Sequence, residues 1–419
     1  MNINELHPRL RDAVAAAEQI AEPRLRDIDR LIDVNQWKTI RAFQAHKVSD
    51  FHFHGSTGYG YNDRGRETLD EVYATVFGAE AGLVRPHFAS GTHTIATALF
   101  GVLRPGDELL FVTGSPYDTL HKAIGAEGDG TGSLRDWGVK VTIVPLTPEG
   151  RVDWPAVEAA WNPAVKVVAM QRSRGYEWRA SFTVEELGEM ARRAKALNPE
   201  VITFLDNCYG EFTEEREPTE VGIDLMAGSL IKNPGGGIAP TGGYIVGRRR
   251  LVELSAYRLT APGIGAEVGS MLGATRPIYQ GLFLAPHAVG QALKGAVFAA
   301  ALFDALGFVT HPRWDEPRSD IIQAVRFKEP SQLIAFVQSV QRASAVDAHV
   351  VPEPWDMPGY EHPVIMAAGT FIQGGSLEFS ADAPIREPYT AYMQGGLTYS
   401  HVKIGVVSAV QRMMEEKLL

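Results

Sequence analysis

Apolar positions near the start of the chain repeat at helical spacing. In residues 9–46, Leu25, Ile28 and Leu31 fall on one face of a helix, and polar residues occupy the opposite face. The opening residues carry scattered charges and lack the basic segment followed by an apolar segment that marks a secretory signal. The sequence therefore predicts a helical N-terminal arm, residues 1–50, that packs against the rest of the protein.

Beyond a Gly-, Asn- and Tyr-rich loop at residues 49–68, short apolar runs alternate with helical patterns. Apolar runs bounded by turn residues are typical of buried strands, and their alternation with helices favours a mainly parallel sheet. A short apolar piece lies at residues 83–85, strands are predicted at 108–112, 139–144, 165–170 and 201–205, and helices are predicted at 92–103 and 184–196. This pattern predicts an α/β fold in which helices flank the sheet.

The pattern changes after about residue 290. A long Ala-rich helix is followed by strand-like and helical pieces of mixed character, and the chain ends in a predicted helix near residues 400–416. We therefore expect a large domain over residues 51–290 and a smaller α+β domain over residues 291–419.

Composition and charge narrow the class of protein. Of 419 residues, 45% are hydrophobic and 21% are charged, which is typical of a globular protein. The net charge of −10 has the wrong sign for a general binder of nucleic acid or of anionic membranes.

The most apolar stretch, residues 295–303, is bounded by Lys294 and Asp304 and is too short to span a bilayer, so no transmembrane helix is expected. A single cysteine, Cys208, excludes an internal disulfide and a Cys-based zinc site and fits a reducing compartment, so we expect a cytoplasmic protein without membrane or nucleic-acid partners.

A small Gly-containing turn precedes the predicted helix at residues 92–103. Its residues Ser90, Gly91 and Thr92 lie at a helix N-terminus, where unpaired backbone N–H groups and the helix dipole favour a phosphate. The turn matches neither GxGxxG nor the P-loop pattern, so dinucleotide and P-loop sites lose support. By itself, Ser90 fits a plain helix N-cap at least as well.

Two further residues change this picture. Asp206 ends a predicted buried strand, and ligands of open parallel sheets bind at the carboxyl ends of strands, although an isolated Asp there is usually a turn former. Lys232 lies among small and apolar residues just before a run of glycines, a setting that suits a desolvated amine. The Ser-x-x-Lys pattern from Ser229 to Lys232 is also found in penicillin-binding enzymes, but their SDN and KTG elements are missing here.

Taken together, the turn, Asp206 and Lys232 match the needs of pyridoxal phosphate. The lysine forms a Schiff base with this cofactor, the aspartate keeps the pyridine nitrogen protonated so that the ring acts as an electron sink, and the turn holds the 5′-phosphate. The residues therefore predict pyridoxal 5′-phosphate as the cofactor.

Several longer stretches resemble one known family over nearly the whole chain. They are GYGYNDRGRE, VRPHFASGTHTIATALFGVLRPGDELL, QRSRGYEWRASF, DNCYGEF, AGSLIKNPGGGIAPTGGY, YRLTAPGIG and QGGSLEFSADAPIREPY. The sequence resembles the fold-type-I pyridoxal-phosphate enzymes of the cystathionine-lyase and methionine-gamma-lyase superfamily, in particular the aluminium-resistance or methionine-gamma-lyase-like branch. The resemblance implies a mainly parallel sheet of the seven-stranded type, a smaller C-terminal domain, and a homodimer or homotetramer whose active sites are shared between subunits.

The same resemblance implies roles for individual residues. Lys232 is the Schiff-base lysine, Asp206 is the partner of the pyridine nitrogen, and Tyr117 stacks on the cofactor ring, so these three are the expected catalytic residues. The phosphate is held by Ser90, Gly91, Thr92 and Ser229.

A neighbouring subunit is also expected to reach the phosphate. In cystathionine lyases a Tyr-Ser-Arg element makes this contact, but the matching region here departs from that motif. Which of its aromatic and basic residues reaches the phosphate stays open among Tyr59, Tyr61, Arg64 and Arg66.

Three other groups of residues are candidates for function. His52 and His54 imitate the HxH pair of metal-dependent hydrolases, but no matching ligand set follows them, so no metal site is expected. Arg172 and Arg174, in the segment after a predicted strand, either bind substrate or form interface ion pairs. Arg386 is the best candidate to clamp a substrate carboxylate, because a guanidinium pairs with it through two hydrogen bonds, and the alternative is a structural salt bridge.

The predicted function is that of a pyridoxal-phosphate-dependent carbon–sulfur lyase. It would eliminate a thiol from a sulfur-containing amino acid, as methionine gamma-lyases and cystathionine beta-lyases do, and the sequence leaves β- and γ-elimination open. One alternative is another reaction of the same cofactor, such as transamination, racemisation or decarboxylation, because the cofactor frame does not fix the reaction. The other is a cofactor-binding regulatory or metal-tolerance protein with little turnover.

Overall fold

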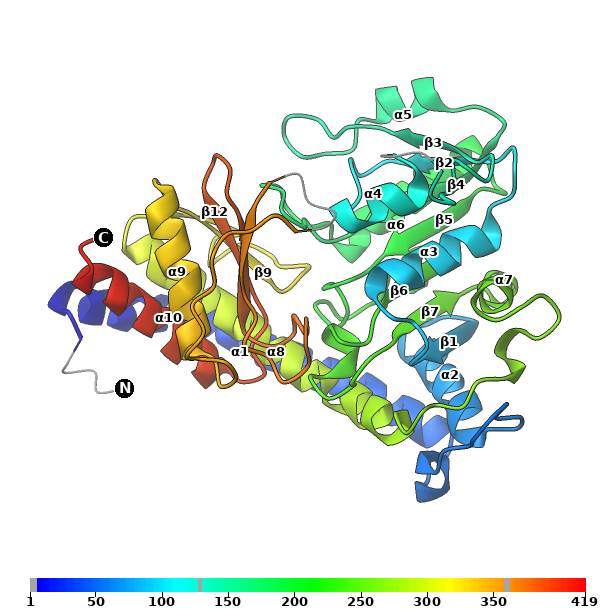
Figure 1. Ribbon diagram of the computed structural model, residues 1–419, viewed down its shortest axis with the longest axis horizontal. Helices are drawn as coiled ribbons and strands as arrows, with labels where there is room; N and C mark the ends of the chain where they lie inside the picture. The colour runs from blue at the N-terminus through cyan, green and yellow to red at the C-terminus, as the bar shows by residue number, and fades with distance from the viewer. Residues whose placement is uncertain (1–5, 127–129, 358–361) are drawn as a thin grey trace.

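Two β-sheets divide the chain into two domains. The computed structural model describes residues 6–126, 130–357 and 362–419. We call the part built on the larger sheet the large domain and the part built on the smaller sheet the small domain. In Figure 1 the large domain lies on the right and the small domain on the left, and two long helices, α1 (Pro8–Ala45) and α8 (Thr275–Ala305), run beneath both.

The large sheet holds seven described strands in the order β1-β7-β6-β5-β4-β2-β3. Their bounds are β1 Ala81–Arg85, β2 Glu108–Phe111, β3 Lys140–Ile143, β4 Val165–Gln171, β5 Ile202–Asp206, β6 Leu225–Ser229 and β7 Gly243–Gly247. Every neighbouring pair in this described sheet is parallel except the two pairs made by β7. The prediction of a mainly parallel sheet is confirmed, but the apolar pattern does not reveal β6 and β7, because glycines interrupt or bound their short runs.

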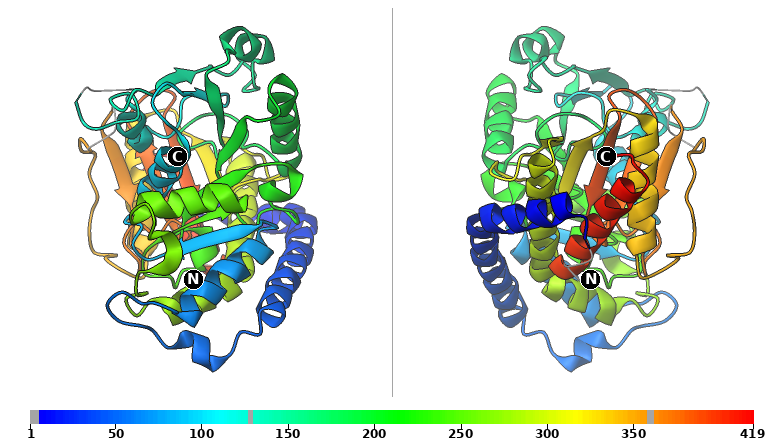
Figure 2. Two further views of the ribbon diagram at one scale, coloured as in Figure 1. Left: turned by 90° about the vertical axis from the view of Figure 1, so that its right-hand side faces the viewer. Right: turned by 90° about the vertical axis from the view of Figure 1, so that its left-hand side faces the viewer.

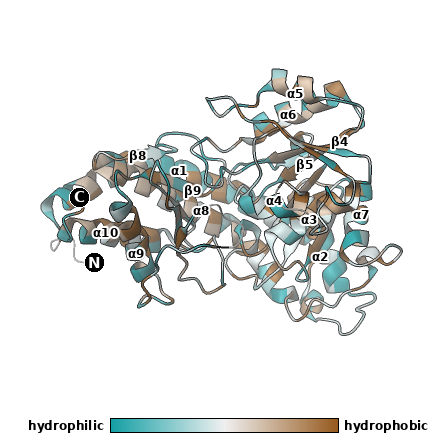
Figure 3. Cartoon of the chain, turned by 45° about the horizontal axis from the view of Figure 1, so that its top comes forward, coloured by the Kyte–Doolittle hydropathy of each residue, from teal (hydrophilic) through white to brown (hydrophobic). Residues whose placement is uncertain are grey.

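Alternate residues of each strand enter two different cores, one on each face of the large sheet. In β2, for example, Leu109 and Phe111 belong to one core and Leu110 belongs to the other. The first core is closed by α3 (Gly91–Val102), α4 (Asp118–Ile124) and α7 (Arg249–Leu259), and the second by α2 (Arg64–Val76), α6 (Val184–Leu197) and α8, with α5 (Trp154–Ala160) at the edge. In Figure 3 interior strands such as β4 are brown, whereas much of the helical surface is teal. Burial on both faces explains why the strands read as continuous apolar runs.

The small domain is built on an antiparallel sheet in the order β10-β11-β12-β9-β8. Its strands are β8 Val309–His311, β9 Ile322–Arg326, β10 Val364–Ala367, β11 Ser380–Pro384 and β12 Thr390–Gln394, and its helices are α9 Pro330–Ala343 and α10 Tyr399–Glu415. The predicted smaller α+β domain is therefore present, and α10 confirms the helix expected near residues 400–416.

The N-terminal helix α1 confirms the predicted arm and ties the two domains together. Near its start the backbone N–H of His7 donates to Gln411 of α10, and just beyond its end His46 hydrogen-bonds to Thr75 of α2 at 2.7 Å. Figure 2 shows α1, in dark blue, as two stretches set at an angle to one another. Pro23 lies inside the helix, and a proline removes a main-chain hydrogen bond and bends a helix.

The helix α8 is longer than the apolar stretch suggests, because it begins at Thr275. Contrary to the sequence expectation, its length and composition would be sufficient to cross a membrane, but 78% of its most apolar window is buried inside the protein, as in a core helix. A Cβ atom added at Gly290 would lie 2.2 Å from Ile32, so this glycine lets α1 pack closely on α8. Position 290, where the sequence pattern changes, therefore lies inside a continuous helix.

Candidate cofactor and substrate site

A cavity of about 210 Å³ lies in the large domain where β5 and β6 end and α3 begins. Five of the predicted site residues line it: Gly91, Thr92, Tyr117, Asp206 and Lys232. Gln171, Cys208 and Tyr209 also contribute to the lining. These residues are far apart in the sequence. They meet because parallel strands end at the same edge of the sheet, as expected for a ligand site in an open α/β fold.

Asp206 is the last residue of β5, and its carboxylate is buried at the floor of this cavity. One carboxylate oxygen, Oδ1, accepts a hydrogen bond from the backbone N–H of Cys208 at 3.0 Å. Burial raises the pKa of Asp206, while the positive charge of Lys232 and the Cys208 N–H act in the opposite direction. A cationic group inside the cavity would therefore stabilise the ionised carboxylate.

Lys232 follows β6 and is held in place by its neighbours. The side-chain amide of Asn233 donates to the carbonyls of Tyr209 and Glu211 at 3.0 and 2.9 Å, which ties the lysine segment to the turn after Asp206. The Nζ atom of Lys232 lies 4.0 Å from the centroid of the Tyr209 ring. Burial by itself lowers the pKa of Lys232, but the neighbouring Cys208, Tyr209 and Asp206 side chains reverse the effect, so the pKa is raised overall.

The turn after Asp206 has an unusual backbone. Tyr209 has a φ angle of 73°, in the left-handed region that aromatic residues rarely adopt. The hydrogen bond from Asn233 to its carbonyl helps to hold this conformation. The surrounding structure therefore fixes the Tyr209 ring beneath the lysine, which is how strained residues at functional sites are commonly maintained.

A hydroxyl without a partner among the described residues lies beside the predicted phosphate turn. Ser229 is buried, and its Oγ atom makes no hydrogen bond to any described residue. Gly91, the first residue of α3, lies against it, since an added Cβ atom would be 3.5 Å from the Ser229 Cβ. A buried hydroxyl beside the N–H groups of a helix start suits an anionic oxygen, so these residues fit the phosphate of pyridoxal phosphate.

The other two residues of the turn have structural partners of their own. Ser90 is the N-cap of α3, and its Oγ atom accepts from the backbone N–H of His93 at 3.1 Å, so its side chain serves as the helix cap that the sequence also allowed. Thr92 Oγ1 hydrogen-bonds to Thr119 Oγ1 at 2.7 Å. Thr92 still lines the cavity.

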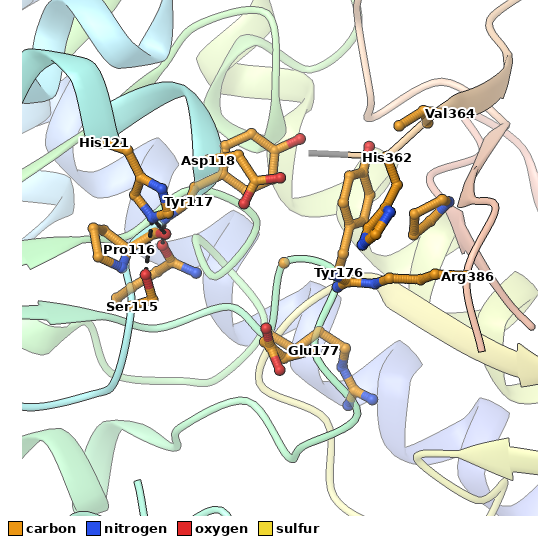
Figure 4. A pocket seen from close by; sticks show the side chains of 14 residues that line it. Ser115, Pro116, Tyr117, Asp118, His121, Tyr176, Glu177, His362, Val364 and Arg386 are labelled. Atoms are coloured by element: carbon orange, nitrogen blue, oxygen red, sulfur yellow. Dashed lines mark hydrogen bonds between the residues drawn. The ribbon is translucent and has the colours of Figure 1, made fainter. Parts of the chain in front are cut away.

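A second cavity of about 220 Å³ adjoins the first and lies between the two domains. Figure 4 shows Asp118 and His121 on one side, His362 and Arg386 on the other, and Tyr176 between them. The two cavities share Tyr117, Gln171 and Gly175, so Tyr117 stands at their junction. Arg386 is half-buried in a loop of the small domain and faces the space next to the predicted cofactor site.

Arg172 and Arg174 are placed differently. Both side chains are fully buried, with 0% exposure. Arg172 pairs with Glu214 at 2.6 Å, and Arg174 donates to the carbonyl of His311 at 2.9 Å. Arg174 also borders the second cavity, and among the described residues its Nη1 atom has hydrogen-bond partners in the small domain whereas its Nε and Nη2 atoms have none. These contacts agree with the alternative that the sequence left open, ion pairs at packing interfaces, and substrate binding by either arginine stays a prediction.

The loop expected to reach a neighbouring subunit lies outside the cavities just described. Tyr59 and Tyr61 are 74% and 63% exposed, and the centroids of their tilted rings lie 5.6 Å apart. Arg64 is exposed, whereas Arg66 is fully buried and donates to the carbonyls of Gly60 and Gly269. Arg66 thus stabilises the loop, and Arg64 is the arginine with a side chain accessible from outside.

His52 and His54 stand on a short helix, η2 (Asp50–Phe53), and at its end. His52 Nδ1 accepts from the backbone N–H of Ser49 at 3.0 Å, so the ring caps its own turn. No group of three or more potential metal ligands gathers in the part of the chain that the structure describes.

Some site residues carry no clear signal in the sequence. Tyr209 and Thr119 line the cofactor cavity, and Asn233 fixes the lysine segment, but none belongs to a motif whose chemistry is recognisable in isolation. Tyr209 and Asn233 could have been found only through their neighbours, because Tyr209 lies three residues after Asp206 and Asn233 directly follows Lys232. Thr119 is brought in by the packing of α4.

Comparison with known proteins agrees with this geometry. The sequence model of the methionine gamma-lyase family matches residues 10–414. An uncharacterised Bacillus subtilis protein, YnbB, is 56% identical over 395 residues, which are 94% of each chain. A Clostridium novyi carbon–sulfur lyase involved in aluminium resistance superimposes with a TM-score of 0.94 and 47% identity, over 97% of this chain and 96% of that chain.

A Listeria monocytogenes structure is equally similar. That protein, for which the activity of a cystathionine beta-lyase involved in aluminium resistance has been suggested, has a TM-score of 0.94 and 55% identity, over 96% of this chain and 99% of that chain. Family match, fold and site residues point the same way, and the chain belongs to the methionine gamma-lyase family.

Proposed function

We propose that the protein is a pyridoxal-phosphate-dependent carbon–sulfur lyase that eliminates a thiol from a sulfur-containing amino acid. The observation that carries this proposal is the meeting of Asp206, Lys232 and the start of α3 in one cavity, with Arg386 facing an adjoining cavity. The first cavity provides what the cofactor needs, and the second provides room for an amino acid. Membership of the methionine gamma-lyase family supports the same reaction class.

Each group that would hold the cofactor has a counterpart in the structure. The Ser229 hydroxyl and the backbone N–H groups at the start of α3 would hold its phosphate, the Asp206 carboxylate would face its pyridine nitrogen, and Tyr117 would cover its ring. When bound, pyridoxal phosphate supplies an electron sink for the negative charge that forms when an amino acid loses its Cα proton. The Asp206 carboxylate would make this sink effective by stabilising a protonated pyridine nitrogen.

Lys232 would have two successive roles. It would hold the cofactor covalently in the resting protein, and as a free amine it would take the substrate's Cα proton. Burial alone disfavours the charged ammonium, but the neighbouring Cys208, Tyr209 and Asp206 side chains raise the pKa of Lys232 overall in the cofactor-free protein. The Tyr209 ring against Nζ and the Asn233 hydrogen bonds keep this amine at the cavity wall.

Arg386 would hold the substrate's α-carboxylate and thereby place its sulfur-bearing side chain in the second cavity. In β-elimination the Cβ–S bond breaks after loss of the Cα proton, and the departing thiolate takes up a proton. In γ-elimination a second proton must leave Cβ before the Cγ–S bond breaks. One water then hydrolyses the remaining enamine or imine, so the first route yields pyruvate and ammonia beside the thiol, and the second yields 2-oxobutyrate and ammonia beside the thiol.

The experiment is to load the purified protein with pyridoxal phosphate and to assay a panel of sulfur amino acids for thiol, ammonia and 2-oxo acid. Borohydride reduction and peptide mapping of the loaded protein should place the label on Lys232. An oxo acid without thiol would indicate transamination, and a D-amino acid would indicate racemisation. Loading without turnover of any amino acid would favour the regulatory or metal-tolerance alternative, and a label on another lysine would contradict the assignment of Lys232.

A further inference from the structure

A segment of the large domain, residues 171–182, is fastened to the small domain. The hydroxyl of Ser173 donates to Asp320 at 2.9 Å, and Arg174 donates to the carbonyl of His311 at 2.9 Å. The hydroxyl of Ser319 in turn donates to the carbonyl of Ser181 at 2.8 Å. These contacts run to β8 and to the connection between β8 and β9. We call residues 171–182 the bridging segment.

Two strands of the small sheet contact Tyr176 of the bridging segment. The hydroxyl of Tyr392 on β12 donates to the carbonyl of Tyr176 at 2.6 Å, and the two rings lie 5.4 Å apart. On β11, the Asp382 carboxylate interacts with the Tyr176 side chain and accepts from Gln394 at 3.0 Å. Two neighbouring strands of the small domain therefore hold both the backbone and the ring of Tyr176.

The bridging segment also contacts Tyr117 in three ways. The side-chain oxygen of Gln171 accepts from the backbone N–H of Tyr117 at 2.7 Å. The Tyr176 ring lies 5.7 Å from the Tyr117 ring. Gly175 has a φ angle of 56°, and a Cβ atom added to it would lie 3.4 Å from a Tyr117 ring carbon. The backbone at Gly175 therefore packs directly against the Tyr117 ring. Tyr117 is thus held by the segment that the small domain holds.

From these contacts we infer that Tyr176 is a positioning residue, through which the small domain orients the Tyr117 ring over the cofactor. The inference rests on the proposed placement of the cofactor. A catalytic ring acts well only when its orientation is fixed by packing and hydrogen bonds behind it. The contacts from β11 and β12 provide this support across the domain boundary, where Arg386 of the same domain approaches from the opposite side of Tyr176 (Figure 4).

The test uses substitutions that remove one hydroxyl and keep the ring. Y392F removes the hydrogen bond to the Tyr176 carbonyl, and Y176F removes the hydroxyl that faces Asp382. Y389F is the matched control, because Tyr389 immediately precedes the same strand while its side chain has no hydrogen bond to the bridging segment within the described residues. Loss of one neutral hydrogen bond should lower kcat about two- to tenfold in Y392F and Y176F. Y389F should match the wild type.

Two further measurements separate positioning from general weakening of the fold. The visible circular dichroism of the bound cofactor, which reports the asymmetry of its surroundings, should change in Y392F and Y176F at unchanged thermal midpoint. In the cofactor-free protein, backbone amides of residues 171–182 should exchange hydrogen faster in Y392F than in Y389F.

A double-mutant cycle tests whether the effect passes through Tyr117. If it does, Y392F should cost much less in a Tyr117→Ala background than in the wild type, because the ring to be oriented is gone. Full additivity, or unchanged dichroism and exchange in Y392F, would overturn the inference. Failure of the wild type to take up pyridoxal phosphate would instead contradict the proposed function, and the exchange result in the cofactor-free protein would keep the two failures distinct.

Discussion

The Asp206 carboxylate is the charge on which the proposed chemistry depends most. In Asp206→Asn the amide keeps the size of the side chain but has no negative charge to stabilise a protonated pyridine nitrogen. We expect kcat to fall by about 100-fold or more, in the range seen when one preorganised electrostatic group is lost. Cofactor should still bind, because the phosphate turn is intact. Steady-state kinetics together with cofactor titration check this, and near-normal turnover would mean that Asp206 is structural.

A substitution at Arg386 tests the substrate hypothesis most directly. Arg386→Lys keeps the charge but loses the two-pronged geometry that matches a carboxylate. A charge-assisted contact is worth about 1.5–3 kcal/mol, so kcat/KM should fall about ten- to hundredfold while cofactor affinity stays constant. Loss of cofactor with unchanged kcat/KM in the loaded fraction would assign Arg386 to the fold.

At the scale of elements, β6 ends beside the start of α3 in a buried hydroxyl that has no partner among the described residues. Ser229→Ala removes that buried, unpartnered Oγ atom. The cofactor-free protein should be as stable as the wild type or more stable by about 1 kcal/mol, because an unpaired buried hydroxyl is costly. Affinity for pyridoxal phosphate should fall about tenfold or more, because a hydrogen bond to a charged phosphate is lost. Chemical unfolding and cofactor titration give the two values, and an equal loss in both would contradict a phosphate role.

The turn between β5 and β6 gives a pH-dependent prediction. Burial raises the pKa of Glu211 from 4.5 to about 8, although the hydrogen bond from Tyr244, at 2.7 Å, opposes the rise. The folded protein therefore holds a proton that the unfolded chain has lost, so this group's contribution to stability is complete below pH 4.5 and is lost as pH rises toward 8.

Glu211→Gln keeps an oxygen for Tyr244 and removes the titration. The variant should therefore gain free energy of unfolding relative to the wild type as pH rises from 5 to 8, by at least about 2 kcal/mol. Urea unfolding of the cofactor-free proteins at both pH values measures this gain. A constant difference between the two proteins would show that Glu211 titrates normally.

At the scale of the whole molecule, the exposed Tyr59–Tyr61 loop leads to a prediction about assembly. Exposed aromatic rings next to the accessible Arg64 are typical of a protein interface. We propose that this loop completes the cofactor site of a second copy. Lys232→Ala subunits mixed with Arg64→Ala subunits should then regain part of the activity, because a hybrid contains one site with both residues intact. Full activity of separated monomers at high dilution would contradict shared sites.

The local sequence determined those features that short-range chemistry encodes. The helical arm, most strands of the large sheet and the terminal helix follow from apolar spacing, because a buried face requires that spacing whatever the neighbour. Asp206 and Lys232 could be named as candidate cofactor residues because Asp206 ends a predicted strand and Lys232 precedes a run of glycines. Few cofactors require an aspartate and a lysine in these two settings. The glycine-rich β6 and β7 were not identifiable, since their burial depends on neighbouring strands rather than on their own apolar content.

Tertiary structure alone decided which charged residues face the site. Arg172, Arg174 and Arg386 look alike in sequence, but Arg172 forms a buried ion pair, Arg174 is buried against the small domain at the edge of the cavity, and Arg386 is half-buried and faces the cavity. Likewise, the sequence does not show that Thr119, Tyr176 and Asp382 lie near the site. They do so only because α4, the bridging segment and the small sheet pack together. The physical reason is that a side chain's chemistry depends on its burial and its partners, and partners distant in the chain are set by packing, which no local pattern records.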